Sequence, residues 1–570
     1  MKKRAVAIIL AAATALSMAA CGSSGSSTSG GASSAASQAQ DTSEASTEAA
    51  SQAEEATSTA AAADAGDPWA GWKDIDTSEH VVINYMTTGD KPSGDAAKRL
   101  DEMLAKLNAI LTEKCNAEIQ IYYIGWTDYL SNYNLTLAQM DGTVDLVGTS
   151  SDWLDAWKNA KNGAFLELSP EMLQTYAPAT WASVPQEHWD NCKYNGDIYL
   201  MPEDNYAQWV NHGFIYRKDW AEEAGLSDGV NSWEDMTTYF EGVKKNHPDV
   251  TPWNSDGTQN VQLASGWVAS HTNFIPIDGI AGSALWGGTK DDPYTVVTPA
   301  YTDKDMMVKY AEFMKHWDEI GVWPTDVLNN AAGSANKDQY RVGQTAAEQH
   351  HTQTWTDLCS HTDANKIYQT DPKADSGFFY FGEETNNVVA MSITHGAMAV
   401  SAASANPERA LMVYDLIRND ADCYDLFNYG IKGVSWDVNA DGMRITPDGY
   451  NPDTDNINGM TNFWWGRNDD LEIKDATRNW DEIDPLYEKY DSLKIDYPYA
   501  SFIPDVDAIQ GEIDNVNEVY GNYMKQISFG KYQGSAEDIV NEMDEELKQA
   551  GIEEVTAELQ SQLDAQYKNK

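Results

Sequence analysis

The sequence is short of basic residues and has no long apolar run. Its 570 residues include 38 Lys and Arg against 89 Asp and Glu, which gives a formal net charge of −51. Nucleic acids require a basic footprint, so this charge excludes general nucleic-acid binding and argues against adsorption to an anionic membrane surface. No segment reaches the ~18 uninterrupted apolar residues of a membrane-spanning helix. Hydrophobic residues make up 42% of the chain, enough for a globular protein with a sizeable core.

Cysteines are also few. Apart from Cys21, they are Cys115, Cys192, Cys359 and Cys423, which lie far apart and show no C-x-x-C spacing. Four cysteines in a chain of this length are not a disulfide scaffold, and the sequence leaves all three possible pairings open. We favour buried free thiols.

Enzyme signatures are missing from the globular part of the sequence. It has no phosphate-binding G-x-x-x-x-G-K-[ST], no H-E-x-x-H, no G-x-S-x-G and no G-x-G-x-x-G. His350 and His351 are adjacent, so a regular strand or helix would not place them on one face, and this weakens a zinc interpretation. We therefore predict no catalytic residue, no metal and no cofactor. A glycoside hydrolase with two catalytic carboxylates is the alternative enzyme, but with 89 acidic residues candidate carboxylate pairs are too common to identify one.

The N-terminal residues have the pattern of an export signal. A basic start is followed by thirteen apolar residues over 5–17 and by Met18-Ala19-Ala20-Cys21. This end resembles the lipobox of bacterial lipoproteins, which implies a signal peptide over 1–20 and a diacylated Cys21; a plain signal peptide is the alternative. Residues 21–66 are rich in Ser, Ala and Gly without an aromatic residue, so we predict a disordered, lipid-anchored tether.

The globular part opens with alternating strand and helix patterns. Apolar, β-branched runs predict strands at 80–86, 118–124 and 144–148, and apolar residues at helical spacing predict helices over 95–114 and 128–140. Strand, helix, strand, helix, strand indicates a parallel α/β layer.

Polar loops follow two of these strands. Asp90 and Lys91 come after the first, and Asp152 comes after the third. Ligands of open parallel sheets bind outside the carboxyl ends of the strands, so these side chains are candidate ligand contacts. Ordinary turn chemistry is the alternative explanation for them.

Five short motifs follow one another along the chain. They are Asn195–Pro202 (N-G-x-x-Y-x-x-P), Tyr216–Asp219 (Y-R-K-D), Ser232–Asp235 (S-W-E-D), Gly343–Ala346 and Asn406–Ala410 (N-P-E-R-A). In this order they resemble family 1 of the extracellular solute-binding proteins of ABC importers. The resemblance covers about 80–435. It implies two α/β lobes that close on a ligand by a hinge, as in periplasmic binding proteins, with no covalent chemistry.

The resemblance also implies boundaries and partners. We predict lobe 1 at 78–203 plus 360–405 and lobe 2 at 210–355 plus 410–570, with a first crossing near 200–210; the role of the long tail stays open. The expected partners are the permease subunits of an ABC importer and, through Cys21, the outer face of the bacterial cytoplasmic membrane. We expect the protein to act as a monomer.

Aromatic residues suggest the ligand. The chain holds 20 Trp and 29 Tyr, whose flat apolar faces suit the C–H faces of sugar rings, while polar neighbours read the hydroxyls. We predict a neutral oligosaccharide; a peptide or another polar solute, or an anchored adhesion protein, is the alternative. By resemblance, Asp90, Lys91 and Asp152 match sugar contacts of the maltodextrin-binding branch, and Trp355 matches a stacking aromatic. The predicted ligand-binding residues are Asp90, Lys91, Trp126, Asp152, Trp153, Asp204, Asn205, Tyr206, Trp209, Trp355, Trp464, Trp465 and Arg467.

One acidic segment resembles a calcium loop. Residues 437–448 follow D-x-N-x-D-G with Asp448 at the twelfth position. Pro447 intrudes, and no helix pattern clearly flanks the segment. We favour a hairpin with an Asp-Gly turn.

Overall fold

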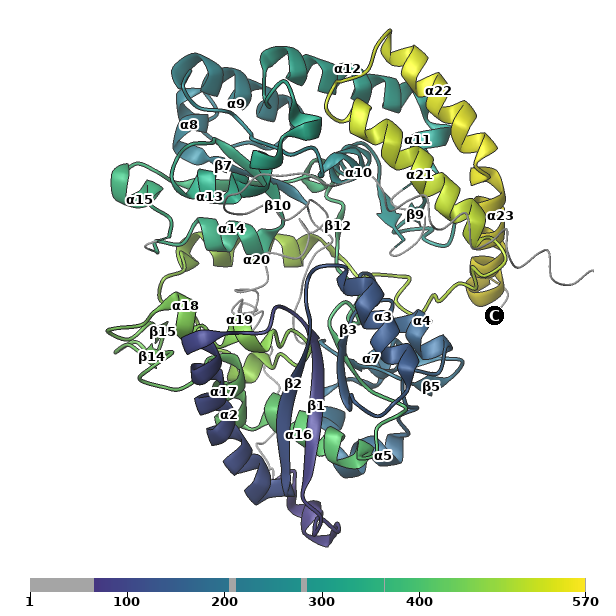
Figure 1. Cartoon of the computed structure of the whole chain (residues 1–570). Helices are drawn as coiled ribbons and strands as arrows, with labels where there is room; N and C mark the ends of the chain where they lie inside the picture. Colours follow the sequence, from purple (N-terminus) through teal and green to yellow (C-terminus); the bar gives the residue numbers. More distant parts are fainter. Residues whose placement is uncertain (1–65, 205–211, 278–283, 363, 569–570) are drawn as a thin grey trace, which may run out of the picture. The chain divides into compact units, whose positions relative to one another are not determined.

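The structure is a computed structural model that describes residues 66–204, 212–277, 284–362 and 364–568. Its helices and strands form two large hydrophobic cores, each built around its own sheet (Figure 1). Among these residues, no helix is both long and apolar enough to cross a membrane.

The first sheet has five strands in the order β2-β1-β3-β13-β6. Strand β1 pairs in parallel with β2 and β3, while β13 runs antiparallel to both β3 and β6. The carboxyl ends of β1, β2 and β3 therefore share one edge with the start of β13. The strands are β1 (Val81–Thr88), β2 (Ala117–Ile124), β3 (Leu146–Thr149), β6 (Met201–Pro202) and β13 (Ala397–Val400).

Helices pack on this sheet through apolar faces. The predicted first helix is α2 (Gly94–Cys115), which buries Leu100, Met103, Leu107, Leu111 and Cys115 at helical spacing. The predicted order strand, helix, strand, helix, strand is confirmed. Other helices of this core include α3 (Tyr129–Gln139), α4 (Ala156–Lys161), α16 (Pro407–Asn419) and α17 (Ala421–Asn428).

The second sheet is antiparallel, with the order β10-β7-β11. Helix α9 (Trp233–Asn246) begins at the S-W-E-D motif, where the Ser232 hydroxyl accepts a hydrogen bond from the Asp235 amide at 3.0 Å. The other elements of this core include β7 (Gly213–Arg217), α8 (Lys218–Glu223), α12 (Lys304–Ile320), β10 (Ala347–His350), α14 (Thr352–Leu358) and β11 (Ser376–Tyr380).

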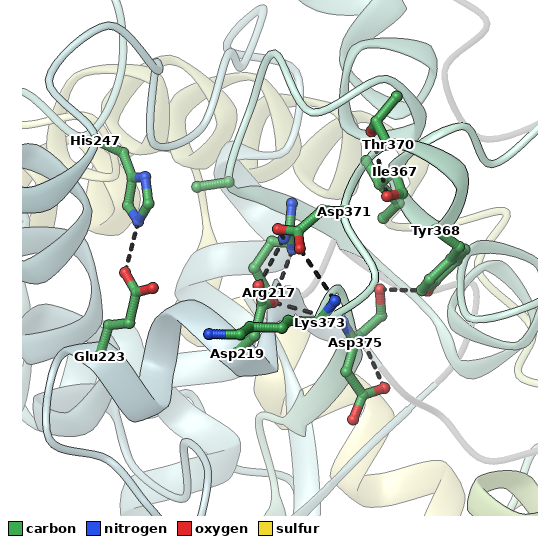
Figure 2. A network of polar contacts seen from close by, with 12 residues as sticks. Arg217, Asp219, Glu223, His247, Ile367, Tyr368, Thr370, Asp371, Lys373 and Asp375 are labelled. Atoms are coloured by element: carbon green, nitrogen blue, oxygen red, sulfur yellow. Dashed lines mark hydrogen bonds and ion pairs between the residues drawn. The ribbon is translucent and has the colours of Figure 1, made fainter.

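A buried polar network fixes the edge of this sheet where β7 ends (Figure 2). The Arg217 guanidinium is 3% exposed and contacts Asp219 at 2.6 Å and Asp371 at 3.0 Å. The Lys218 amide donates to the Asp375 carbonyl at 2.9 Å. These contacts attach the loop that precedes β11 to the end of β7.

The two cores divide the chain differently from the predicted boundaries. Strand β11 falls within the 360–405 segment assigned to lobe 1, yet it pairs with β7 in the second sheet. Helix α17 and residues up to Trp465 fall within the 410–570 segment assigned to lobe 2, yet they pack in the first core. The reason is long-range pairing: β11 covers an open edge of β7, which local periodicity cannot reveal.

The C-terminal helices extend the second core. Their apolar faces bury Val516, Tyr520, Met524, Val540 and Leu559 in the same cluster as α9 and α12. The helices are α21 (Gln510–Ile527), α22 (Ala536–Gln549) and α23 (Ile552–Leu563).

Two smaller interpretations are also tested by the structure. Residues 437–445 form the favoured hairpin, with β14 (Asp437–Val438) paired to β15 (Arg444–Ile445). Within the described ranges, no group of three or more His, Cys, Asp or Glu side chains could hold a metal ion. The four cysteines after residue 66 are buried free thiols, as predicted.

Candidate ligand-binding site

Three loops at one edge of the first sheet bring four tryptophans together. We call Trp126, Trp153, Trp464 and Trp465 the tryptophan cluster. The ring centroids of Trp126 lie 6.5 Å from Trp153 and 6.1 Å from Trp464, with interplanar angles of 25° and 21°. Trp153 stacks on Trp465 at 5.9 Å, and Tyr129 meets both Trp126 and Trp153 at 5.9 Å. All four tryptophans were predicted from the sequence, but Tyr129 was not.

The cluster has a buried base and a partly exposed surface. Trp465 is 1% exposed and lies flat on β3, where a Cβ at Gly148 would fall 2.2 Å from its Nε1. Any larger residue at 148 would displace the indole. Trp126, Trp153 and Trp464 are half-buried, so they can present ring surface to a ligand.

Hydrogen bonds to β1 hold the loop that carries Trp464 and Trp465. The Asn462 carbonyl accepts the hydroxyls of Tyr85 and Thr87, both at 3.0 Å, and its side-chain amide donates to the Thr88 carbonyl at 3.0 Å. A Cβ at Gly89 would lie 2.0 Å from the Asn462 Nδ2. The cluster is therefore supported on a buried strand, which favours a preorganised surface.

Asp152 and His395 form a pair beside Trp153. The Asp152 Oδ2 contacts the Nδ1 of His395 at 2.9 Å, and the Ser150 hydroxyl donates to the other Asp152 oxygen. Burial alone would raise the pKa of Asp152, but the His395 imidazole and the hydrogen bonds hold it below its usual range. His395 was not predicted as a site residue. It precedes β13, and because β13 runs antiparallel to β3, the start of β13 lies next to the loop that follows β3. The position before a strand is the one feature of the sequence that could have indicated His395.

Glu203 is a second buried carboxyl at this edge. Its amide donates to the Gly396 carbonyl at 2.8 Å, and a Cβ at Gly396 would lie 2.4 Å from the Glu203 Oε2 and 3.0 Å from the Trp464 carbonyl. Burial raises the pKa of Glu203 to about 7, against the opposing charges of Arg467 and His395.

The substitution Glu203→Gln should stabilise the protein by about 1–2 kcal/mol at pH 7.5. The folded state keeps this proton up to pH about 7, whereas the unfolded chain releases it near pH 4.5. The contribution of Glu203 to stability is therefore complete below about pH 4.5 and is lost as the pH rises toward 7. Thermal unfolding at pH 4.5 and 7.5 checks this, with Glu203→Asp as the charged control. A Gln variant whose Tm falls at pH 7.5 would contradict it.

Two other predicted charged residues, Arg467 and Asp204, are buried in ion pairs. The Arg467 Nε donates to Asp469 at 2.6 Å, with the guanidinium 4% exposed. The two oxygens of Asp204 contact Arg418 at 3.0 Å and His188 at 2.9 Å. The structure therefore places Arg467 and Asp204 in buried positions with protein partners.

The remaining predicted residues are spread out. Asp90 lies at the edge of the cluster, where its Oδ1 accepts the Trp126 amide at 3.4 Å. Lys91 lines a groove of about 750 Å³ between α2 and β2. Trp355 is 3% exposed in a separate core, and its Nε1 donates to the Ser376 carbonyl at 2.9 Å. Cys21, Asn205, Tyr206 and Trp209 lie outside the described residues.

The arrangement has the chemistry of a sugar site. Partly exposed indole faces offer a flat apolar surface, and carboxylates at their edge accept hydrogen bonds from hydroxyl groups.

A family comparison decides the class of protein. The model of the bacterial extracellular solute-binding proteins matches residues 93–418, more than half of the chain. The chain belongs to this family. The two-lobed α/β fold predicted from the sequence is confirmed by the solved structures of similar proteins. Residues 498–568 of this solute-binding protein also match a domain of unknown function, DUF3502.

Known relatives agree with this assignment. The solute-binding protein is 24% identical to a carbohydrate ABC transporter substrate-binding protein of Streptococcus pneumoniae, over 87% of this chain and 93% of the relative. The N-glycan transport solute-binding protein NgtS of Streptococcus pneumoniae has a similar fold, with a TM-score of 0.66 and 21% identity over 86% of this chain and all of that one. The alginate-binding protein AlgQ2 follows, with a TM-score of 0.56 and 15% identity over 85% and 98% of the two chains.

Proposed function

We propose that this solute-binding protein captures a neutral oligosaccharide and delivers it to an ABC importer. The observation that carries the proposal is the tryptophan cluster with Asp152 and Glu203 at its edge. The relative named a carbohydrate ABC transporter substrate-binding protein supports it, as do structures of NgtS titled as complexes with Man1GlcNAc and Man5GlcNAc.

The charges of the site favour a neutral ligand. Asp90, Asp152 and Glu203 lie at the cluster, while the nearby cations Arg467 and His395 are engaged by Asp469 and Asp152. A uronate or sialic acid would bring another negative charge to these carboxylates, which costs binding free energy in a partly buried site. The formal net charge of −51 also disfavours the binding of an anionic ligand.

Binding is not followed by chemistry in this proposal. The two lobes close because the closed form makes more contacts with the ligand than the open form does. The complex then docks on the permease as a monomer.

Membrane attachment completes the proposal. A diacylated Cys21 would supply two acyl chains, which is enough for stable anchoring. The body would then stay at the outer face of the cytoplasmic membrane. Radiolabelled palmitate should enter the wild-type chain and not a Cys21→Ala variant; equal labelling of both would refute the anchor.

Calorimetric titration of residues 22–570 with Man1GlcNAc and Man5GlcNAc tests the function. Alginate oligosaccharides serve as the acidic comparison, and chromatography of each mixture detects cleavage. We expect saturable binding of the neutral glycans, at least tenfold weaker binding of the acidic ones, and no product. Cleaved glycan would support a hydrolase instead, and preferential binding of alginate would refute the neutral-ligand assignment.

A further inference from the structure

Three histidines come together at one end of the second sheet, and we call them the imidazole cluster. His212 directly precedes β7, His350 ends β10 opposite Gly213, and His351 follows it. The ring centroids of His350 and His351 lie 4.3 Å apart, and each lies 6.3 Å from the ring of His212. All three side chains are partly exposed, so the cluster is not a sealed part of the core.

One buried nitrogen of the imidazole cluster has no hydrogen-bond partner among the described residues. This atom is the Nδ1 of His351. Leaving such an atom unpaired is unfavourable, so a ligand that supplies a hydroxyl group would be favoured there.

A second contact orients the His212 ring. The Gln349 side-chain amide lies 3.1 Å from the His212 Nδ1. If the amide donates, Nδ1 is the acceptor and the ring proton is on Nε2, which becomes a donor that points away from the glutamine.

The surroundings keep the imidazoles neutral at physiological pH. Burial lowers the pKa of His212 to about 3 and that of His350 to about 4, and it lowers the pKa of His351 strongly. The Glu348 carboxylate on β10 acts to raise the pKa of His350. The positive charge of Lys337 lowers the pKa of both His350 and His351, and the His395 imidazole lowers that of His351. A neutral imidazole carries one donor and one acceptor, which matches a sugar hydroxyl.

We propose that His212, His350 and His351 form a second hydroxyl-binding subsite for the oligosaccharide, separate from the tryptophan cluster. Their nitrogens donate to and accept from hydroxyl groups of a neutral sugar. In the described ranges, no group of three or more His, Cys, Asp or Glu side chains is arranged to hold a metal ion. The subsite rests on the proposed function, because it requires an oligosaccharide ligand.

The variants His212→Gln, His350→Gln and His351→Gln test the subsite in the chain 22–570. Calorimetry with Man5GlcNAc should show at least tenfold weaker binding for two or more of them. His316→Gln is the control, since that exposed histidine of α12 contacts Glu241 at 3.8 Å and should leave the affinity within twofold. Circular dichroism of each variant checks that it is folded.

A second readout does not depend on any variant. In protein labelled with ¹⁵N-histidine, saturating Man5GlcNAc should shift the imidazole nitrogens of the cluster and not those of His316. Unchanged affinities together with unshifted resonances would overturn the subsite while wild-type binding leaves the proposed function standing. A wild-type chain that binds neither Man1GlcNAc nor Man5GlcNAc would overturn both.

Discussion

Replacing Trp465 by alanine should lower the free energy of unfolding by about 3–5 kcal/mol, the usual cost of deleting a buried aromatic ring. Trp465 is 1% exposed and packs on Gly148 and on the ring of Trp153. The hydroxyl of Tyr414 also donates to its carbonyl at 2.9 Å, which fixes the backbone but cannot fill the cavity that the indole would leave. The base of the tryptophan cluster would collapse.

Urea unfolding followed by circular dichroism measures this loss. Trp465→Phe should retain part of the stability because the phenyl ring fills most of the space, and it serves as the conservative control. An alanine variant within 1 kcal/mol of the wild type would show that Trp465 is not a packing residue. Binding measurements on a variant that unfolds at the assay temperature would say nothing about contacts, so stability has to be determined first.

Local elements were predictable because their signals are local. Apolar residues at helical spacing identify α2, and β-branched runs identify β1 and β2 within a few residues of their observed bounds. The start of α9 at Ser232 follows from its capping side chain. None of these features depends on a distant part of the chain.

The division of the chain into two cores was harder to predict from the sequence, because it depends on pairings between segments that are far apart in the chain. Strand β11 joins β7 across about 160 residues, and Asn462 binds to Thr88 across 374. Periodicity shows that a strand exists, but it carries no information about which open edge the strand will cover.

The candidate site was predicted in part for the same reason. Residue type and loop position identified Trp126, Trp153, Trp464 and Trp465. The family resemblance favoured Trp355, whose indole is packed and hydrogen-bonded in a core. His395 and Glu203 come into the site only because β13 lies between β3 and β6 in the sheet. A sequence that contains 20 Trp and 89 acidic residues offers too many candidates of each type.

Under the proposed function, this edge of the sheet gives up stability for binding. A buried carboxyl with a pKa near 7 and glycines that yield space to Asn462, Trp465 and Glu203 are features that a core alone would not need. Functional sites commonly keep such costs because a prearranged surface binds its ligand with less reorganisation.

Replacing Trp464 by alanine should weaken the binding of Man5GlcNAc by tenfold to a hundredfold, about 1.4–2.7 kcal/mol, without unfolding the protein. Trp464 is half-buried and stacks on Trp126 at 6.1 Å, so its removal takes away ring surface at the top of the cluster and leaves Trp465 in place. The loss of free energy of unfolding should stay below that of Trp465→Ala because less of the side chain is packed.

Calorimetry with Man5GlcNAc provides the affinity, and Trp181→Ala provides the control. Trp181 is also half-buried and stacked, on Trp189 at 5.1 Å, but none of its contacts involves the tryptophan cluster. A general effect of deleting an indole would lower both affinities alike, whereas a ligand contact would lower only that of Trp464→Ala. An unchanged affinity for a folded Trp464→Ala variant would remove this residue from the binding surface and leave Trp126 and Trp153 to be tested as its remaining exposed rings.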